Sequence, residues 1–166
     1  MAVILEKLTV MLEIDMPGFG SIKLEYLVSD FTGTLSLDGN LLPKAREKLN
    51  VISQFLKIFV LTADEFGKAR EELKDVNCTV HVMEGDNVGV QKREFVRKLG
   101  AEKVVALGNG ANDREMLKGA KLGIIIAGME GCAVEALMAS DIQVTTFVDG
   151  LDLLLNPRRL RATLRI

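Results

Sequence analysis

The hydrophobic pattern of the N-terminal part of the chain predicts a β-hairpin that leads to a carboxylate. Apolar and polar residues alternate over 8–14 and again over 22–26, the period of a strand with one buried face. The turn-forming cluster DMPGFGS lies between these stretches. The apolar run 26–28 then ends the second strand, and Asp30 follows, with Gly33 soon after to permit an abrupt turn. The hairpin therefore feeds a loop that carries Asp30.

The rest of the chain alternates short apolar runs with stretches of helical period. Strands are predicted at 58–61, 80–82, 103–107, 122–126 and 142–144, and helices from 43 to 56, over 66–73, over 90–99, after 113, near 130–139 and from 157. Strands that alternate with helices predict a parallel sheet with helices on both faces. We therefore expect one doubly wound, Rossmann-like α/β domain over 1–166, with 1–23 as the strand and turn that lead into its core.

Local signals refine three boundaries. Asp38-Gly39 lies between short apolar pairs and predicts a small second hairpin, which would lean over a ligand at Asp30. Pro43 is placed as the first residue of a helix, and Asn156 and Pro157 as the cap and first residue of the last one.

Composition narrows the class of protein. The 166 residues are 48% hydrophobic and 27% charged, which is ordinary for a globular protein, and the net charge of −2 gives no reason to expect nucleic acid or an anionic membrane as partner. Cys78 and Cys132 lack metal-type spacing and predict free thiols. No apolar run is long enough to span a bilayer, and the N-terminus lacks the basic start of a signal peptide. We expect a cytoplasmic protein.

Polar residues that follow the predicted strands suggest phosphate chemistry. Asp30, Thr62 and the loop Gly108-Asn109-Gly110-Ala111-Asn112-Asp113 all lie at strand ends, which a doubly wound sheet gathers into one crevice. Two close carboxylates, Asp30 and Asp113, would raise each other's pKa unless a cation lay between them. Mg²⁺ suits this place because it binds one or two carboxylates together with phosphate oxygens. Lys92 would add a compact positive charge, and the hydroxyl and N–H of Thr62 could donate to phosphate.

In order and content these segments resemble the haloacid dehalogenase superfamily of phosphohydrolases and phosphotransferases. The resemblance covers nearly all of the chain after Leu24 and includes DFTGT, Thr62, Lys92 and GNGAND. It implies a nucleophilic Asp30 and a bound Mg²⁺, with the Thr32 carbonyl as a third ligand. We accordingly predict catalytic roles for Asp30, Thr32, Thr62 and Lys92, substrate binding by Thr62, Ala63, Lys92 and Asn112, and metal binding by Asp30, Thr32, Asp113 and Asn109.

Two departures from the family pattern stand out. Thr32 replaces the second Asp of the first motif, the usual general acid/base, and Asn109 stands where an Asp is common. Thr at the first of these positions is the version found in P-type ATPases, D-K-T-G-T, and GNGANDREML resembles their G-D-G-x-N-D segment. The chain thus resembles a soluble relative of the phosphorylation domain of those pumps. We do not expect a pump, because no nucleotide-binding domain fits between Asp30 and Lys92 and no apolar run of membrane length occurs in the 166 residues.

The same spacing predicts an open site. Strands and helices already fill the intervals from Asp30 to Thr62 and from Thr62 to Lys92, so no cap domain fits there. Small capless phosphatases of sugar-acid phosphates form tetramers in which neighbours cover the site. Those phosphatases keep the Asp that Thr32 replaces in this chain. The resemblance to them therefore implies only that this protein forms an oligomer. With the hairpin offering an exposed edge, we predict a homo-oligomer, either a dimer or a tetramer.

Several residues have simpler interpretations. Thr62 and Glu65 also match a helix capping box, and Asn112 also suits a helix N-cap. Lys92 lies on a helix rich in charge, so it could be a surface residue, with Lys121 as the alternative site lysine. Asn109 could simply shape its turn.

Other residues have roles that lie outside the site. His81 lies in an apolar strand and is expected to be packed rather than catalytic. Phe19 is expected to be exposed, where it would pack against a neighbouring subunit. The basic tail (Arg158, Arg159, Arg161 and Arg165) suits a solvated face, an oligomer contact or an anionic partner.

The sequence therefore predicts a Mg²⁺-dependent phosphatase that hydrolyses a small phosphorylated substrate through an aspartyl-phosphate on Asp30. One alternative is ATP hydrolysis, suggested by the pump-like motifs. The other is a phosphate- or nucleotide-sensing module that forms the phospho-aspartate but scarcely turns over. Thr32 separates these, because it removes the obvious base for the attacking water.

Overall fold

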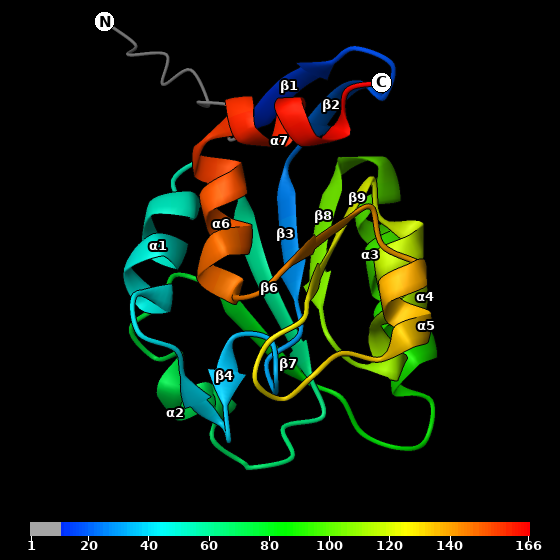
Figure 1. Cartoon of the computed structure of the whole chain (residues 1–166). Helices are drawn as coiled ribbons and strands as arrows, with labels where there is room; N and C mark the ends of the chain where they lie inside the picture. Colours follow the sequence, from blue (N-terminus) through cyan, green and yellow to red (C-terminus); the bar gives the residue numbers. More distant parts are fainter. Residues whose placement is uncertain (1–10) are drawn as a thin grey trace, which may run out of the picture.

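A parallel six-stranded sheet forms the centre of the protein. The structure is a computed structural model and describes residues 11–166. The sheet has the order β10-β9-β8-β3-β6-β7 (Figure 1) and contains β3 (Tyr26–Ser29), β6 (Lys57–Thr62), β7 (Thr79–Val82), β8 (Val104–Gly108), β9 (Leu122–Ile126) and β10 (Ile142–Val144). The chain runs outward from β3 to β7 and then returns to β8 on the other side of β3. This reversal beside β3 is the place where doubly wound sheets leave a crevice.

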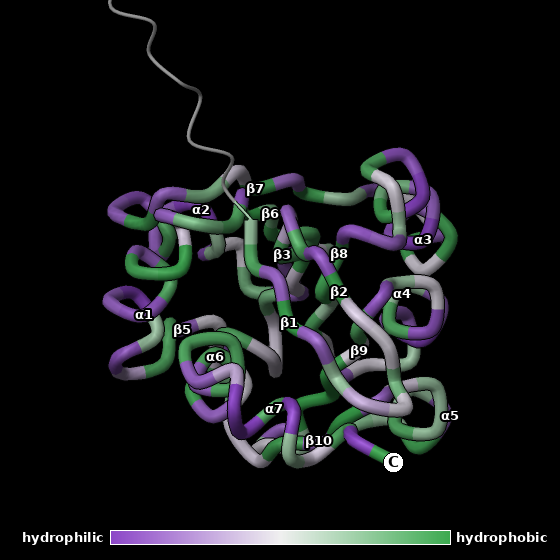
Figure 2. Tube along the Cα trace, turned by 90° about the horizontal axis from the view of Figure 1, so that it is seen from above, coloured by the Kyte–Doolittle hydropathy of each residue, from purple (hydrophilic) through white to green (hydrophobic). Residues whose placement is uncertain are grey.

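Helices cover both faces of the sheet, as predicted. They are α1 (Ala45–Ile52), α2 (Ala69–Glu72), α3 (Val88–Leu99), α4 (Arg114–Gly119), α5 (Val134–Met138), α6 (Phe147–Leu155) and α7 (Pro157–Leu164), with short 3₁₀ turns at Ala101–Lys103 and Ala111–Asp113. Figures 1 and 2 show α1 and α6 on one side of the strands and α3, α4 and α5 on the other. The predicted α/β class is therefore confirmed.

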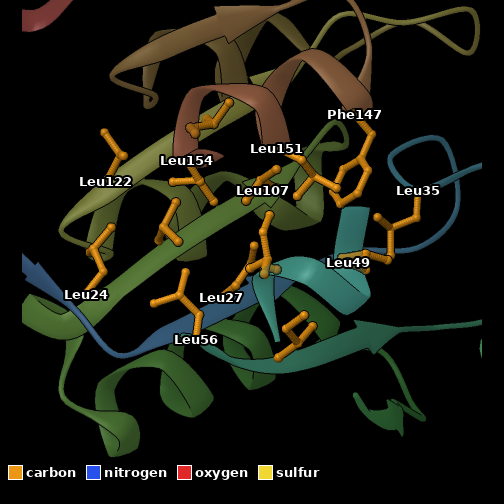
Figure 3. Close-up of a cluster of buried hydrophobic side chains, with 14 of the residues drawn as sticks. Leu24, Leu27, Leu35, Leu49, Leu56, Leu107, Leu122, Phe147, Leu151 and Leu154 are labelled. Carbon is orange, nitrogen blue, oxygen red and sulfur yellow. The ribbon is translucent and has the colours of Figure 1, made fainter. Parts of the chain in front are cut away.

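Two apolar layers hold the helices to the sheet. Because side chains alternate across a strand, Leu27 and Leu107 point into the layer beneath α1 and α6, and Val28 and Ala106 into the layer beneath α3 and α4. All four are fully buried. Figure 3 shows the larger layer, where the α6 side chains Phe147, Leu151 and Leu154 meet leucines of the sheet. Each such side chain contributes about 1.5–3 kcal/mol by leaving water.

The N-terminal hairpin closes the end of the sheet where the strands begin. It consists of β1 (Leu12–Met16) and β2 (Gly20–Leu24) and lies beside α7 (Figure 1). The predicted part over 8–10 lies outside the described residues. The hairpin stops at Leu24, two residues earlier than predicted, because Glu25 already hydrogen-bonds to Lys103 and Lys57 at the start of the sheet. Tyr26 therefore begins the central strand.

The expectation of an exposed Phe19 is wrong. Its ring is partly buried against the core, and the Lys121 ammonium lies 5.7 Å from the ring centroid. Packing within its own chain occupies the side chain that was expected to face a neighbouring subunit. His81, by contrast, packs as predicted, with ring centroids 5.0 Å from Phe95 and 6.0 Å from Phe59.

Several element boundaries differ from those predicted. α1 begins at Ala45 rather than Pro43, because Lys44 adopts a left-handed φ of 67° and no helix can pass through it. α2 and α5 are shorter than their apolar patterns suggested. α6 was not predicted from the sequence. Its signal is Thr146, whose hydroxyl accepts a hydrogen bond from the Asp149 N–H as an N-cap, ahead of apolar residues at helical spacing.

The predicted flap is present at the opposite end, where the strands finish. It is formed by β4 (Ser36–Leu37) and β5 (Asn40–Leu41), paired antiparallel. The backbone N–H of Leu41 donates to the Glu72 carboxylate at 2.8 Å, which ties the flap to α2. Within residues 11–166, no helix combines the length and apolar character required to cross a membrane.

Packing of α4 on β9 yields a test of this fold. A Cβ added to Gly123 would lie 2.5 Å from the backbone oxygen of Leu117, so Gly123→Ala should lower the free energy of unfolding by about 1–3 kcal/mol. Gly119 on α4 is the matched control, because a Cβ there meets nothing within 4 Å. Gly119→Ala should leave stability unchanged or raise it by up to about 1 kcal/mol. Urea unfolding measures both, and equal effects would contradict this packing.

Candidate active site

A cavity of about 250 Å³ lies at the carboxyl ends of the central strands. Its walls come from the loops after β3, β6, β8 and β9, and its lining residues are Asp30, Thr32, Thr62, Ala63, Asp64, Glu65, Asn109, Gly110, Asn112 and Glu130. Of the residues predicted for the site, all but Lys92 and Asp113 line this cavity. Those two lie fully buried beneath it.

The loop after β3 holds Asp30 in a fixed position. The Asp30 backbone N–H donates to the Leu107 carbonyl at 2.9 Å, which ties the loop to β8, and the residue is only 6% exposed. Gly33 then turns the chain with a φ of 76°. A side chain at that position would collide with the amide of Asn109, so both the φ and the close approach require glycine.

Lys92 brings the predicted residues together. It comes from α3 and is 1% exposed. Its Nζ donates to Asp30 Oδ1 at 2.9 Å, to Asp113 Oδ1 at 2.8 Å and to Asn112 Oδ1 at 3.2 Å. The interpretation of Lys92 as a surface residue is therefore wrong, as is that of Asn112 as a helix cap, since α4 has no side-chain cap. Lys121, the alternative lysine, lies against Phe19 at the other end of the sheet.

Asp113 shapes the loop after β8. Its Oδ2 accepts hydrogen bonds from the backbone N–H groups of Asn109 at 3.0 Å and Gly110 at 2.9 Å. The loop thus wraps around this carboxylate, and Gly108 makes room for it, since a Cβ there would lie 2.6 Å from the Asp113 side chain. One lone pair of Oδ1 remains after the bond to Lys92.

Thr62 ends β6, where its hydroxyl accepts a hydrogen bond from the Asp64 N–H at 2.8 Å. The predicted capping box of Thr62 and Glu65 is wrong, because the chain keeps Thr62 in the sheet and α2 begins only at Ala69. Asp64 caps that helix instead, accepting from the N–H groups of Lys68 and Ala69 at 3.0 Å each. The Thr62 O–H therefore keeps its own hydrogen for a ligand in the cavity.

Thr34 links two loops of the site, a role that was not predicted from the sequence. Its hydroxyl lies 3.1 Å from Asn109 Oδ1 and 3.4 Å from Asp30 Oδ2. Asn109 also donates to the Gly131 carbonyl at 3.1 Å, so it both lines the cavity and shapes its loop. The sequence signal was the second Thr of DFTGT, which the turn at Gly33 carries back toward Asp30.

Thr32 is unusual because its hydroxyl is buried without a partner. Within residues 11–166, Thr32 Oγ1 is the one buried side-chain polar atom that lacks a hydrogen bond. An unmade bond of this kind costs roughly 1–3 kcal/mol and calls for a functional reason. Thr32 lines the cavity, so this unpartnered hydroxyl belongs to the site.

The charges at the floor of the site do not balance. Burial, and then the neighbouring Asp113 carboxylate, raise the pKa of Asp30 to about 7, although the Lys92 ammonium partly opposes this. Burial alone would lower the pKa of Lys92, but the two carboxylates outweigh it and raise that pKa. Two carboxylates thus share one ammonium, and the site has room electrostatically for a further cation.

The donor set of the site suits magnesium. Asp30, Asp113, Asn109 and the carbonyl of Thr32 all offer hard oxygen atoms, which Mg²⁺ prefers. In the part of the chain that the structure describes, no group of three or more His, Cys, Asp or Glu side chains forms a protein-only metal cage. Two carboxylates completed by water and phosphate oxygens are the usual arrangement for Mg²⁺, so the residues fit this ion.

Comparison with curated proteins reveals two kinds of relative, although no family model matches the chain. The uncharacterized protein MJ0073 of Methanocaldococcus jannaschii is 50% identical over 64 residues, which are 39% of this chain and 69% of that protein. The probable copper-transporting ATPase HMA5 of Arabidopsis thaliana is 33% identical over 129 residues. That match covers 73% of this chain, but the chain spans only 13% of the length of the ATPase.

Solved structures with a similar fold include both phosphatases and a pump. The 3-deoxy-D-manno-octulosonate 8-phosphate phosphatase of Moraxella catarrhalis, solved with magnesium, phosphate and its sugar, has a TM-score of 0.64 and 16% identity over 80% of this chain and 86% of its own. A haloacid dehalogenase (HAD) superfamily hydrolase of Legionella pneumophila has a TM-score of 0.66 and 14% identity, and the match covers 84% of this chain and 86% of the hydrolase. A zinc-transporting PIB-type ATPase has a TM-score of 0.58 and 21% identity, and the match covers 74% of this chain but only 20% of the ATPase.

These matches confirm the resemblance that the motifs suggested. The fold of most of the chain is shared with HAD phosphatases, and that of a smaller part with the pump. The chain therefore belongs to one family with MJ0073 and has the fold of the haloacid dehalogenase superfamily.

Proposed function

We propose that this protein is a divalent-cation-dependent phosphohydrolase that acts through an aspartyl-phosphate on Asp30. The observation that carries the proposal is the Asp30 carboxylate beside the cavity, bonded to the Lys92 ammonium with Asp113 on its other side. A buried carboxylate held by an ammonium at the wall of a cavity is the arrangement of a nucleophile in phosphoryl transfer. The HAD phosphatases of similar fold support the same chemistry.

The first half-reaction transfers the phosphoryl group to Asp30. Asp30 Oδ1 is occupied by Lys92, whereas Oδ2 has only the long 3.4 Å contact with Thr34. Oδ2 is thus the oxygen with lone pairs to spare. A bond forms between the carboxylate and phosphorus, the bond from phosphorus to the leaving oxygen breaks, and that oxygen takes a proton from water. The Thr62 hydroxyl and the backbone N–H of Ala63 would donate to phosphoryl oxygens, with Asn112 beside them.

The second half-reaction returns the phosphoryl group to water and regenerates the Asp30 carboxylate. Mg²⁺, held by Asp30, Asp113, Asn109 and the Thr32 carbonyl, would supply charge neutralisation for the phosphoryl oxygens. Thr32 cannot titrate near neutral pH, so the positioned acid/base that is typically worth roughly 10²- to 10⁴-fold is missing at this position. The chain should therefore hydrolyse its phospho-aspartate slowly.

Slow hydrolysis of the phospho-aspartate is also compatible with a second function, a sensing module in which the phospho-aspartate persists. The unpartnered Thr32 hydroxyl favours it, because no titrating group occupies that position. ATP as substrate is supported by the likeness to HMA5 but opposed by the lining of the cavity, which contains no aromatic side chain from residues 11–166 to stack on a base. The single-domain organisation over 1–166, the dimer or tetramer and the cytoplasmic location stay predictions.

The two buried carboxylates that share one ammonium predict a pH-dependent change in stability, which can be measured without a substrate. Without divalent cation, Asp30 in the folded protein ionises near pH 7 rather than 3.8. Protonation of Asp30 therefore stabilises the folded protein. This contribution is fully present below the pKa of Asp30 in the unfolded chain and is lost as the pH rises through 7. Asp30→Asn cannot ionise, so at pH 8 in EDTA it should exceed wild type in unfolding free energy by ~1–4 kcal/mol, and the difference should vanish toward pH 4.

Urea unfolding between pH 4 and 8 measures this difference. Asp15→Asn is the matched control, because Asp15 is an exposed carboxylate on β1 and its loss should leave the pH dependence of wild type intact. Mg²⁺ should stabilise wild type more than Asp30→Asn. If Asp30→Asn is less stable than wild type at every pH, the account of the charges at this site is wrong.

The missing acid/base predicts biphasic kinetics with p-nitrophenyl phosphate. This leaving group needs little protonation, so release of p-nitrophenol should begin with a burst of enzyme-sized amplitude and continue slowly as the phospho-aspartate hydrolyses. Thr32→Asp should accelerate the slow phase by ~10- to 1,000-fold, because it restores a titrating group beside Asp30. Asp30→Asn should abolish the burst.

Rapid mixing at saturating Mg²⁺ compares these proteins. Thr163→Asp on α7 is the control, since it adds the same charge at an exposed position away from the cavity and should behave as wild type. EDTA should remove activity from all of them. A wild type without a burst, together with unchanged or slower turnover in Thr32→Asp, would show that Thr32 does not limit dephosphorylation.

A further inference from the structure

The mouth of the cavity carries negative charge that the proposed chemistry does not use. Asp64 and Glu65 reach it from the loop after β6, and Glu130 from the loop after β9. We refer to these three residues as the acidic rim. Asp64 also caps α2, but Glu65 and Glu130 are exposed and form no ion pair with any of residues 11–166. Unpaired carboxylates at the mouth would act directly on whatever extends beyond a bound phosphate.

Within residues 11–166, no lysine or arginine lines the cavity or forms an ion pair with Glu65 or Glu130. Among the residues lining the cavity there is no basic side chain, and Lys92 lies beneath the floor, 1% exposed and bonded to Asp30 and Asp113. The ammonium and a divalent cation together carry three positive charges, against four negative charges from the two carboxylates and a phosphate dianion. The floor therefore has no positive charge left to neutralise a second anionic group. Such a group would meet the rim carboxylates alone.

The size of the site points to a compact leaving group. The cavity holds about 250 Å³, and Glu130 is shared with a smaller hollow of about 80 Å³ beneath the flap, lined by Gly33, Leu37, Leu42, Ile126 and Met129 among others. Thr32, whose buried hydroxyl bonds to nothing in the described chain, is one of the polar residues beside this space. A few carbon atoms with one polar end would fill this space.

We propose that the acidic rim makes the site selective for small phosphomonoesters whose leaving group carries a cationic amine, and against those that carry a second anion. The inference rests on the proposed function, since it assumes that phosphate binds beside Asp30. Glu65 and Glu130 are its specificity residues. The carboxylates of these two residues attract an ammonium on the leaving group. They exert little force on a hydroxyl, and they repel a carboxylate or a further phosphate.

Three phosphate esters of equal length test the proposal: phosphoethanolamine with an ammonium, 2-hydroxyethyl phosphate with a hydroxyl, and phosphoglycolate with a carboxylate. The value of kcat/KM should fall in that order, with about tenfold or more between the first and the last at low salt, and the spread should narrow as salt screens the exposed charges. The double variant Glu65→Gln with Glu130→Gln should bring the ratio of phosphoethanolamine to phosphoglycolate several-fold closer to one.

The matched control removes the same charge elsewhere. Glu47 and Glu102 are exposed and do not line the cavity, so the double variant Glu47→Gln with Glu102→Gln should keep the wild-type ratio. Equal kcat/KM values for the three esters, or a preference for phosphoglycolate, would overturn the proposal. So would loss of p-nitrophenyl phosphate hydrolysis in Glu65→Gln or Glu130→Gln alone, because that result would make the residue an acid/base instead of a selector.

A binding measurement separates this inference from the proposed function. Titration calorimetry with Asp30→Asn, Mg²⁺ and each of the three esters reports the order of affinity without turnover. The same order of ester charge is expected, and equal or reversed affinities would overturn the selectivity. If wild type hydrolyses neither p-nitrophenyl phosphate nor any ester, the proposed function fails, whereas the calorimetric order still decides the role of the acidic rim.

Discussion

The Lys92 ammonium between the Asp30 and Asp113 carboxylates is the interaction on which the site depends. It lies 2.9 Å from one and 2.8 Å from the other, and all three side chains are buried. Each belongs to a different part of the chain, so this contact holds the loop after β3, helix α3 and the loop after β8 at fixed distances. Removal of the single ammonium, Lys92, would leave two buried carboxylates uncompensated, and loss of a partner of this kind typically costs about 3–5 kcal/mol.

The same cluster accounts for the reactivity expected of the site. With two negative charges and one positive charge shielded from water, the folded protein raises the pKa of Asp30 through burial and the Asp113 charge. The excess negative charge favours two events at Asp30. A divalent cation would neutralise the carboxylate, and bond formation with an electrophilic phosphorus would remove its charge. The HAD fold brings these groups together by reversing its strand order beside β3.

Much of the fold and the floor of the site was predictable from sequence because both depend on local patterns. The strand over 122–126 was predicted to the residue, since an apolar run of this length between turn signals suits a buried strand and is too short for a typical helix. Asp30 and Asp113 could be placed together because parallel strand ends share one edge of the sheet, and Lys92 could be added through the order of the family's motifs. The partnership of Asn112 with Lys92 could not be distinguished from a helix cap, since Asn serves both roles at a loop end.

The parts that sequence did not reveal are those set by long-range geometry. The early end of the hairpin at Leu24 follows from the hydrogen bonds of Glu25 at the start of the sheet, and the left-handed φ of Lys44 has no signal in the sequence. Asp64 and Glu130 reach the site by turns whose direction has no sequence signature. The acidic rim illustrates this limit, because Glu65 and Glu130 are far apart in the chain and share a cavity only in the folded protein.

The measurement that tests the central claim most directly is a chemical trap of the intermediate. The protein is incubated with acetyl phosphate or p-nitrophenyl phosphate and Mg²⁺, quenched in acid, digested and mapped by mass spectrometry. We predict a phosphoryl group on the peptide that contains Asp30, stable in acid, released by hydroxylamine and absent when EDTA replaces Mg²⁺. Hydrolysis of the substrate with no phosphoryl group on Asp30 at any time point, or a phosphoryl group at another residue, would contradict the proposed mechanism.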